Sequence, residues 1–292
     1  MTTRLFGSSL LLGFLGITSL FSSPVRGQDA ANIAYGNNPL AGHFLTLDGT
    51  QIYYETYGEG GTPLVLLHGG LYGYIEEFGE LIQEMSKHRR VIAIATRGHG
   101  KSELGQKQFS YALFADDALA VIRRETTGKI DLLGFSDGAI TSYTFASAHP
   151  ELLRKLVAIG GPRKFADWDP SAQEEFKNAK PGDVEKGAPQ FVTGRKKLMP
   201  QPQRWEEFVE RLDAMESGPV YVTDDQIRSI KVPTLIVAGD HDQYNQTEKF
   251  VEIFRLLPNG QLAIIPGCGH VVLDCKRAFT IGAVETFLDT RN

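Results

Sequence analysis

One serine stands between two glycines where an apolar segment changes its period. Residues 130–134, IDLLG, read as a strand, residues 138–148 read as a helix, and Ser136 joins them within Gly-Phe-Ser-Asp-Gly. A sharp strand-to-helix turn strains its central residue and leaves room only for glycine on either side. Such a turn lifts the serine hydroxyl above the sheet. It also directs the N–H of Asp137, at the helix start, to where negative charge would develop during acyl transfer.

A serine hydroxyl is a weak nucleophile without a base, so a histidine and an orienting carboxylate are needed. His270 lies in the glycine-rich loop PGCGH after the final apolar strand, and Asp240 and Asp242 follow the strand 234–239. We expect Asp242 to orient His270, because the third residue after a strand can point back across the sheet. Asp240, which more often would turn the chain, remains the alternative. The order Ser136, Asp242, His270 is one of the few known for a catalytic triad.

A second oxyanion donor is expected in the sequence His68-Gly69-Gly70-Leu71, at the end of the strand 64–68. Glycine lets an amide approach the reacting carbonyl closely, so we assign the donor to Gly70, with Leu71 as the next candidate. Each such donor contributes about 3 to 4 kcal/mol to the transition state. His68 is expected to brace the loop rather than react.

The elements that must position these groups alternate between strands and helices. Continuous apolar runs indicate buried parallel strands, because both faces need cover. The expected strands are residues 44–47, 51–57, 64–68, 91–95, 130–134, 156–160, 234–239 and 262–266, and the expected helices are 74–87, 112–125, 138–148, 246–256 and 276–289. The pattern predicts an α/β fold with a doubly wound, mostly parallel sheet of eight strands.

One interval, residues 163 to about 230, contains no strong buried strand and follows the sixth strand of the series. An insertion of that length between core strands predicts a helical cap rather than a loop. Its residues Trp168 and Trp205, together with Leu71 and Asp137, are candidates for binding substrate. Packing within the cap is the alternative for the tryptophans.

The N-terminal segment has the pattern of a signal peptide. Arg4 precedes an apolar run from Leu5 to Phe21, and small residues flank Gly27, so we expect cleavage near Gly27 and a secreted or periplasmic protein. An uncleaved membrane anchor is the alternative. The predicted organisation is a signal peptide at 1–27, a linker at 28–42 and one catalytic domain at 43–292. No stable membrane association is expected after cleavage.

Composition excludes some partners. The net charge is −5, and Lys and Arg are scattered, which argues against binding nucleic acid. The two cysteines, Cys268 and Cys275, could form a disulfide in an exported protein or remain free thiols. With His270 they lack the ligand number and spacing of a zinc site. No metal or organic cofactor is implied.

Together these motifs resemble the α/β-hydrolase-fold serine hydrolases over about residues 43–290. The matching segments are HGG (68–70), TRGHGKS (96–102), GFSDG (134–138), GDHD (239–242) and GCGH (267–270). The resemblance implies Ser136 as nucleophile, Asp242 as acid, His270 as base, and the amides of Gly70 and Asp137 as the oxyanion hole. The family commonly has aspartate where Thr96 stands, so a contact near that turn is expected to differ.

The expected function is cleavage of a small carboxylic ester through an acyl-enzyme, with a small-molecule ester or related acyl compound as substrate. The GxSDG elbow resembles that of valacyclovir hydrolase-like esterases, which cleave amino-acid esters. Asp137 either binds a substrate amine or simply favours the helix start through the dipole. An aminopeptidase or C–C bond hydrolase with the same triad, or a non-catalytic ligand receptor of the same fold, are the alternatives.

Overall fold

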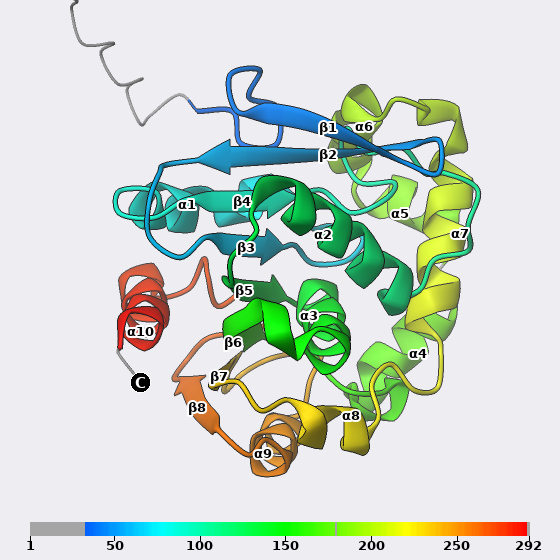
Figure 1. Ribbon diagram of the computed structural model, residues 1–292. Coiled ribbons are helices and arrows are strands. Elements are labelled where there is room, and N and C mark those ends of the chain that lie inside the picture. Colours follow the sequence, from blue (N-terminus) through cyan, green and yellow to red (C-terminus); the bar gives the residue numbers. More distant parts are fainter. Residues whose placement is uncertain (1–32, 179, 291–292) are drawn as a thin grey trace, which may run out of the picture. The chain divides into compact units, whose positions relative to one another are not determined.

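The computed structural model describes residues 33–178 and 180–290, and in that part of the chain eight strands form one sheet. The strand order is β1-β2-β4-β3-β5-β6-β7-β8 (Figure 1). The antiparallel pairs are β1–β2 and β2–β4, and the other neighbours are parallel. The bounds are β1 Gly42–Leu47, β2 Thr50–Tyr57, β3 Leu64–Leu67, β4 Val91–Ile94, β5 Ile130–Phe135, β6 Leu153–Ile159, β7 Thr234–Gly239 and β8 Gly260–Ile265. The predicted fold class is confirmed.

Helices cover both faces of the sheet, which explains why its central strands are continuously apolar. On one face pack α2 (Tyr111–Glu125), α3 (Asp137–Ala148), α8 (Asp224–Ser229) and α9 (Thr247–Leu256). On the other pack α1 (Gly79–Met85) and α10 (Arg277–Asp289), whose apolar residues form a second core cluster. Alternate residues of β5 enter the two cores: Leu132 the first, Leu133 the second.

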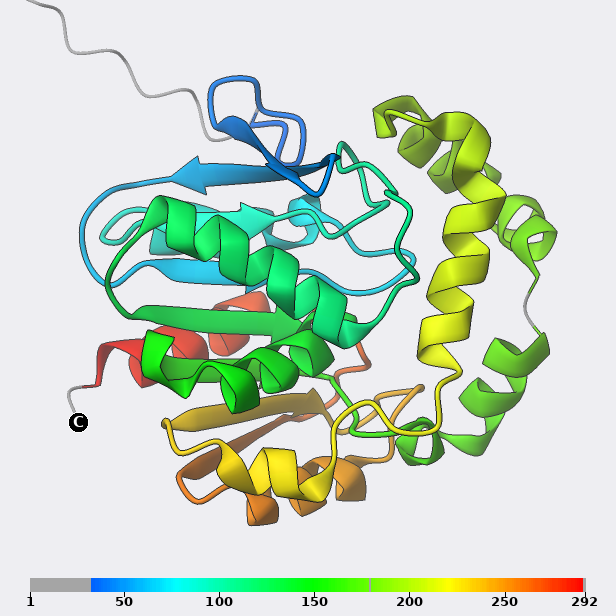
Figure 2. The same ribbon diagram turned by 45° about the vertical axis from the view of Figure 1, so that its right-hand side comes forward.

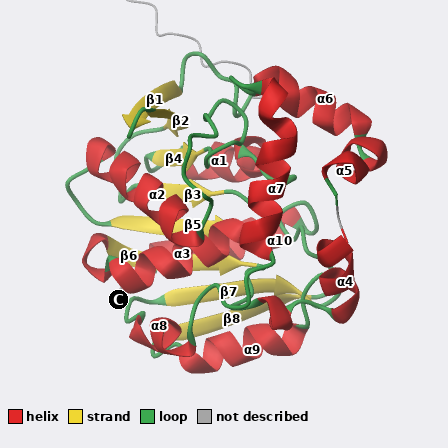
Figure 3. Ribbon diagram, turned by 90° about the vertical axis from the view of Figure 1, so that its right-hand side faces the viewer, coloured by secondary structure: helices red, strands yellow, loops and turns green. Residues whose placement is uncertain are grey.

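The cap helices lie between β6 and β7, as the sequence predicts. They are α4 (Pro170–Asn178), α5 (Pro181–Gly187), α6 (Pro189–Leu198) and α7 (Trp205–Glu216). Figure 2 shows them beyond the arrowheads of the central parallel strands, on the right of the view. Figure 3 looks onto this side, with α7 running across the carboxyl ends of the strands. By contrast α8, which also falls within 163–230, packs against α3 and α9 of the main domain.

Part of the segment expected to be a linker is anchored to the sheet. The N–H groups of Gly36 and Asn38 donate to the carboxylate of Glu55 on β2, at 2.8 and 2.9 Å. The Tyr74 hydroxyl donates to the Gly36 carbonyl at 2.5 Å. Residues 36–38, at the end of the segment expected to be a linker, are thus held by a buried carboxylate of β2. The assignment of residues 28–42 as a linker stays a prediction.

The predicted signal peptide at 1–27 lies outside the described residues. Within those residues, no helix combines the length and the apolar character that a membrane crossing requires.

Candidate active site

Ser136 occupies the turn between β5 and α3 in a strained conformation. Its φ is 54° and its ψ is −116°, a left-handed region that normally favours glycine. A Cβ on Gly134 would lie 2.1 Å from the Gly138 carbonyl oxygen, and a Cβ on Gly138 would lie 1.9 Å from that of Leu67. Both flanking positions therefore require glycine, and the tight turn presents the serine hydroxyl at the carboxyl end of the sheet.

Three loops at this end bring a serine, a histidine and an aspartate into one line of hydrogen bonds. Ser136 Oγ lies 3.0 Å from Nε2 of His270, and Nδ1 of His270 lies 2.9 Å from Oδ2 of Asp242. The Asp242 side chain is fully buried. Because the carboxylate accepts a hydrogen bond from Nδ1–H, Nε2 presents a lone pair to the serine hydroxyl. That is the tautomer a general base needs.

The Asp242 carboxylate is itself fixed by the chain that follows β7. Its Oδ1 accepts from the N–H groups of Tyr244 and Asn245, at 2.9 and 3.0 Å. Its Oδ2 also accepts from the Asn245 amide at 3.2 Å. These donors stabilise the ionised carboxylate and hold its orientation.

Asp240, the alternative acid, contacts a different part of the site. Its Oδ1 accepts from His241 Nδ1 at 2.7 Å and from the N–H groups of Gly267 and Cys268 at 2.5 and 3.3 Å. The hydrogen bond from His241 is the main reason why the Asp240 pKa is lowered. Asp240 therefore braces the start of the loop that carries His270 rather than contacting the imidazole.

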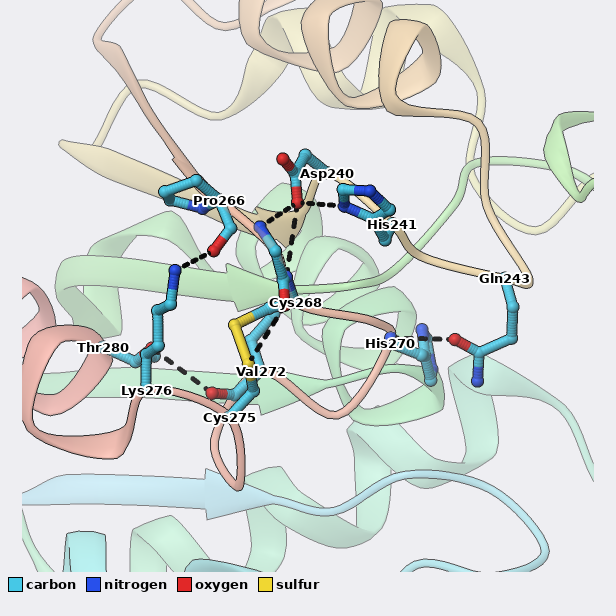
Figure 4. Close-up of a disulfide and its surroundings, with 11 residues drawn as sticks. Asp240, His241, Gln243, Pro266, Cys268, His270, Val272, Cys275, Lys276 and Thr280 are labelled. Atoms are coloured by element: carbon cyan, nitrogen blue, oxygen red, sulfur yellow. Dashed lines mark hydrogen bonds and ion pairs between the residues drawn. A yellow bond between two sulfur atoms is a disulfide. The ribbon is translucent and has the colours of Figure 1, made fainter.

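A disulfide between Cys268 and Cys275 closes the loop around His270. Figure 4 shows the bridge at the base of this loop, with Gln243 reaching the backbone of His270 from the opposite side. The Gln243 Oε1 accepts the His270 N–H at 3.2 Å, and the Cys268 carbonyl accepts the His241 N–H at 2.9 Å. The loop carrying the histidine is therefore tied both to itself and to the loop after β7.

The loop after β3 passes directly beside the serine turn. A Cβ on Gly69 would lie 3.5 Å from Ser136 Cβ, and a Cβ on Gly70 would lie 2.4 Å from Asp137 Oδ2. Among the described residues, the N–H groups of Gly70, Leu71 and Asp137 donate to no protein acceptor. These three N–H groups are therefore free of protein acceptors in the loops that meet at the serine turn.

The Asp137 side chain is buried beside a second carboxyl, that of the partly buried Glu216. Asp137 is 5% exposed, its Oδ1 accepts from the Tyr111 hydroxyl at 2.9 Å, and its carboxyl meets that of Glu216, the last residue of α7. Burial raises the pKa of Asp137 and raises that of Glu216 well above its ordinary value. Asp137 Oδ2 accepts from no N–H or hydroxyl group.

The candidate substrate-binding residues of the cap separate into two positions. Trp168 is buried, its ring centre lies 6.4 Å from that of His270, and its Nε1 donates to the Tyr221 hydroxyl at 2.9 Å. Trp205 instead packs on Phe208 of the same helix, with ring centres 5.4 Å apart. Leu71 is partly buried against the first core cluster. The structure thus brings Trp168, but not Trp205, to the triad.

Sequence reasoning missed Glu216, Tyr111 and Asn245. Tyr111 and Glu216 come from α2 and from the cap, and nothing in their local sequence indicates that they meet Asp137. Asn245 follows Asp242 by three residues, and only the conformation of the loop brings its N–H groups to the Asp242 carboxylate.

Within the described residues, metal-ligand side chains converge at His88, Glu285 and Asp289. This group lies on α10 and the loop before β4, remote from Ser136, and Asp289 is ion-paired with Arg89.

Comparison with known proteins agrees with this fold. The model of the alpha/beta hydrolase family matches residues 64–279, so the chain belongs to this family. It is an α/β serine hydrolase, and the predicted family is confirmed.

Individual relatives are distant. The serine hydrolase BPHL of Homo sapiens is 25% identical over 203 residues, which cover 68% of this chain and 69% of that protein. A 2-hydroxy-6-oxo-2,4-heptadienoate hydrolase of Pseudomonas putida is 27% identical over 288 residues, covering 86% and 97%. The crystal structure of CarC, a serine hydrolase involved in carbazole degradation, matches with a TM-score of 0.70 at 23% identity, covering 86% and 99%. Esterases and meta-cleavage product hydrolases both occur among the similar structures.

Proposed function

We propose that this protein hydrolyses a small carboxylic ester through an acyl-enzyme, with Ser136, His270 and Asp242 as its catalytic residues. The observation that carries the proposal is the continuous hydrogen-bonded line from Ser136 Oγ through His270 to the buried Asp242 carboxylate. It is supported by the strained serine turn and by the free amides beside it.

The reaction follows from these positions. His270 Nε2 takes the Ser136 proton as Oγ attacks the ester carbonyl, and the N–H groups of Gly70 and Asp137 bind the oxyanion. The tetrahedral adduct collapses to the acyl-enzyme while His270 returns the proton to the leaving alcohol. His270 then deprotonates a water molecule that attacks the acyl carbon, and Ser136 regains its proton as the acid departs.

The first experiment measures turnover of p-nitrophenyl acetate and butyrate by the parent and by Ser136→Ala. We expect the variant to lose about 10⁵- to 10⁶-fold in kcat, because the triad acts as a unit. Ser147→Ala, at the far end of α3, where the hydroxyl donates only to the Thr144 carbonyl, is the matched control and should keep full activity. An inert parent would turn attention to the ligand-receptor alternative, and an active Ser136→Ala would refute the triad.

We further propose that Asp137 and Glu216 form a negative subsite for an amine on the acyl side, as in an amino-acid ester. The buried Asp137 Oδ2, which has no hydrogen-bond donor among the described residues, supports this proposal, since a substrate ammonium group would supply one. Asp137→Asn should lower kcat/KM about 10- to 100-fold for an alanine p-nitrophenyl ester, the effect of one charged hydrogen bond, and leave the propionate ester unchanged. Equal losses on both esters would make Asp137 only a contact between the cap and α3.

A C–C bond hydrolase is the second candidate, favoured by the match over nearly the whole length of the Pseudomonas putida relative. Such an enzyme would use the same Ser136 and His270 side chains for catalysis. Turnover of 2-hydroxy-6-oxo-2,4-heptadienoate, compared with p-nitrophenyl acetate at equal enzyme concentration, discriminates the two candidates.

Finally, we propose that the protein is exported and cleaved near Gly27. The disulfide supports this proposal, because such bonds persist in oxidising compartments. N-terminal sequencing of the protein from the medium or periplasm tests it. A chain that retains Met1 and stays with the membrane fraction would favour the anchor instead.

A further inference from the structure

Two buried histidines outside the triad, His68 and His99, contact the backbone of the oxyanion loop. Their exposed fractions are 1% and 4%, and their ring centres lie 4.6 Å apart. His68 Nδ1 lies 2.7 Å from the Gly69 carbonyl oxygen, and His99 Nε2 lies 3.2 Å from the Gly70 carbonyl oxygen. A carbonyl oxygen can only accept, so each of these ring nitrogens must carry a proton to make its bond.

Burial keeps both rings neutral. It lowers the pKa of His99 to about 4 and that of His68 well below its ordinary value. A neutral imidazole has one N–H, so the nitrogen away from the loop must be an acceptor in each ring. The two tautomers therefore differ: Nδ1–H for His68 and Nε2–H for His99.

Thr96 supplies the donor for both accepting nitrogens. Its backbone N–H donates to His68 Nε2 at 3.0 Å, and its hydroxyl lies 2.9 Å from His99 Nδ1 and 3.2 Å from His68 Nε2. Since His68 Nε2 already accepts a hydrogen bond from the Thr96 backbone N–H, the Thr96 hydroxyl donates its hydrogen bond to His99 Nδ1. A proton on Nδ1 could instead donate to the Arg97 carbonyl, 3.2 Å away, but it would leave Nε2 facing the Gly70 carbonyl with no hydrogen to donate. The Nε2–H form gives both ring nitrogens a partner, and we therefore assign it to His99. An aspartate at position 96, common in the family, would have no proton to donate when ionised.

The carbonyls bound by the histidines belong to the peptide groups that carry the N–H groups of Gly70, the proposed oxyanion donor, and of Leu71. In a trans peptide the C=O and the next N–H point in opposite directions. The bond to the Gly69 carbonyl thus sets the direction of the Gly70 N–H. The bond to the Gly70 carbonyl, which also accepts from the Gly73 N–H at 2.7 Å, sets that of Leu71.

We propose that Thr96 fixes the tautomers of His68 and His99, and that these two positioning residues hold the peptide groups on both sides of Gly70, so that the Gly70 N–H points at the oxyanion. The inference rests on the proposed ester hydrolysis for its kinetic consequence, but the tautomers are a property of the resting protein. The three side chains act through the loop backbone, which His68 and His99 contact directly.

The first test is spectroscopic and needs no substrate. ¹⁵N–¹H correlation spectra of histidine-labelled protein at pH 7 should show His68 as the Nδ1–H form and His99 as the Nε2–H form, with assignment by His68→Gln and His99→Gln. In Thr96→Val the backbone donor remains, so the His68 signals should stay while the His99 pattern shifts. Thr96→Ser should restore the parent spectrum. An Nδ1–H form of His99 in the parent would overturn the proposal.

The second test is kinetic. An oxyanion donor is worth about 10²- to 10³-fold in kcat, and a misaimed donor should lose part of this. We expect Thr96→Val to lose about tenfold in kcat on p-nitrophenyl acetate with KM within twofold, and His99→Phe to lose more. Thr96→Ser, and His99→Gln with its amide N–H, should recover most of the activity. Affinity for a trifluoromethyl ketone, whose adduct with Ser136 carries an oxyanion, should fall in parallel with kcat.

The outcomes separate the two proposals. If the parent hydrolyses esters and Thr96→Val matches it in kcat and in ketone affinity, the positioning role is refuted while the ester hydrolase stands. If the parent is inert toward esters but the tautomers and ketone affinities behave as expected, the proposed substrate class fails and the positioning role is supported. A fall in thermal stability with unchanged kcat would indicate a purely structural role and also refute it.

Discussion

Asp240 and Asp242 stand two residues apart, yet only Asp242 reaches the imidazole of His270. We expect Asp242→Asn to lower kcat on p-nitrophenyl acetate by about 10⁴-fold, because an amide can stabilise the wrong histidine tautomer. Asp240→Asn is the matched control and should cost less than tenfold, since it weakens only the brace at Gly267. Steady-state kinetics at pH 7.5 decide. A larger loss in Asp240→Asn would reverse the assignment.

Some residues of the site are marked by their local sequence, whereas others reach it only through tertiary packing. Ser136, His270 and Asp242 each follow a predicted strand and carry a glycine-rich or acidic motif, so the sequence singles them out. Glu216 ends a helix of the cap, and its contact with Asp137 depends on how that helix docks. The role of Thr96 depends likewise on two rings from separate loops. Contacts of this kind have no periodic signature along the chain.

At the scale of elements, two helical glycines, one tightly packed and one with open space around it, allow the cost of a Cβ to be compared. A Cβ on Gly138 of α3 would overlap the β3 backbone, whereas a Cβ on Gly282 of α10 would meet nothing within 4 Å. Gly138→Ala should lower the free energy of unfolding by about 2 to 3 kcal/mol through overpacking. Gly282→Ala should raise it by about 0.5 to 1 kcal/mol, since alanine favours the helix. Urea unfolding measures both, and a neutral Gly138→Ala would contradict the tight elbow.

The disulfide makes a prediction for the loop that carries His270. Replacing both cysteines by serine removes a crosslink around a short loop, which is worth about 2 kcal/mol of stability. Because Asp240 and Gln243 still hold the loop, we expect kcat to fall only a few-fold, with KM unchanged. Stability and kcat are measured with and without dithiothreitol. Dithiothreitol should lower the stability and kcat of the parent to those of the double variant and leave the double variant unaltered. A parent whose stability and kcat do not change with dithiothreitol would contradict the prediction.

The predictability of the elements follows from their burial. Strands such as β5 and β7 are covered on both faces, so they appear as continuous apolar runs. The cap helices are amphipathic and begin at prolines, as α4, α5 and α6 do, and the sequence indicated only a helical insertion. The anchored turn at residues 36–38 escaped prediction because its partner, Glu55, is a charged residue buried within a strand.

For the molecule as a whole, the buried histidines predict that the free energy of unfolding falls as the pH is lowered. An unfolded chain protonates His99 below about pH 6.5, whereas the folded protein does so only near pH 4. This contribution is complete above pH 6.5 and is lost as the pH falls to 4, up to about 1.4 kcal/mol per pH unit. His99→Gln should therefore lose less stability than the parent between pH 6.5 and 4.5 in urea unfolding. Parallel curves for the two proteins would contradict this.

The anchored turn before β1 also limits where the chain can begin. Glu55 is fully buried and accepts from Gly36, Asn38, Tyr53 and Tyr57, so half of its donors lie ahead of the sheet. A chain trimmed to residue 28 keeps all four donors, whereas a chain trimmed to residue 42 leaves this buried carboxyl group with two. The proposed cleavage near Gly27 would therefore keep the anchored turn intact, whereas removal of residues up to 41 would destabilise the first strands of the sheet.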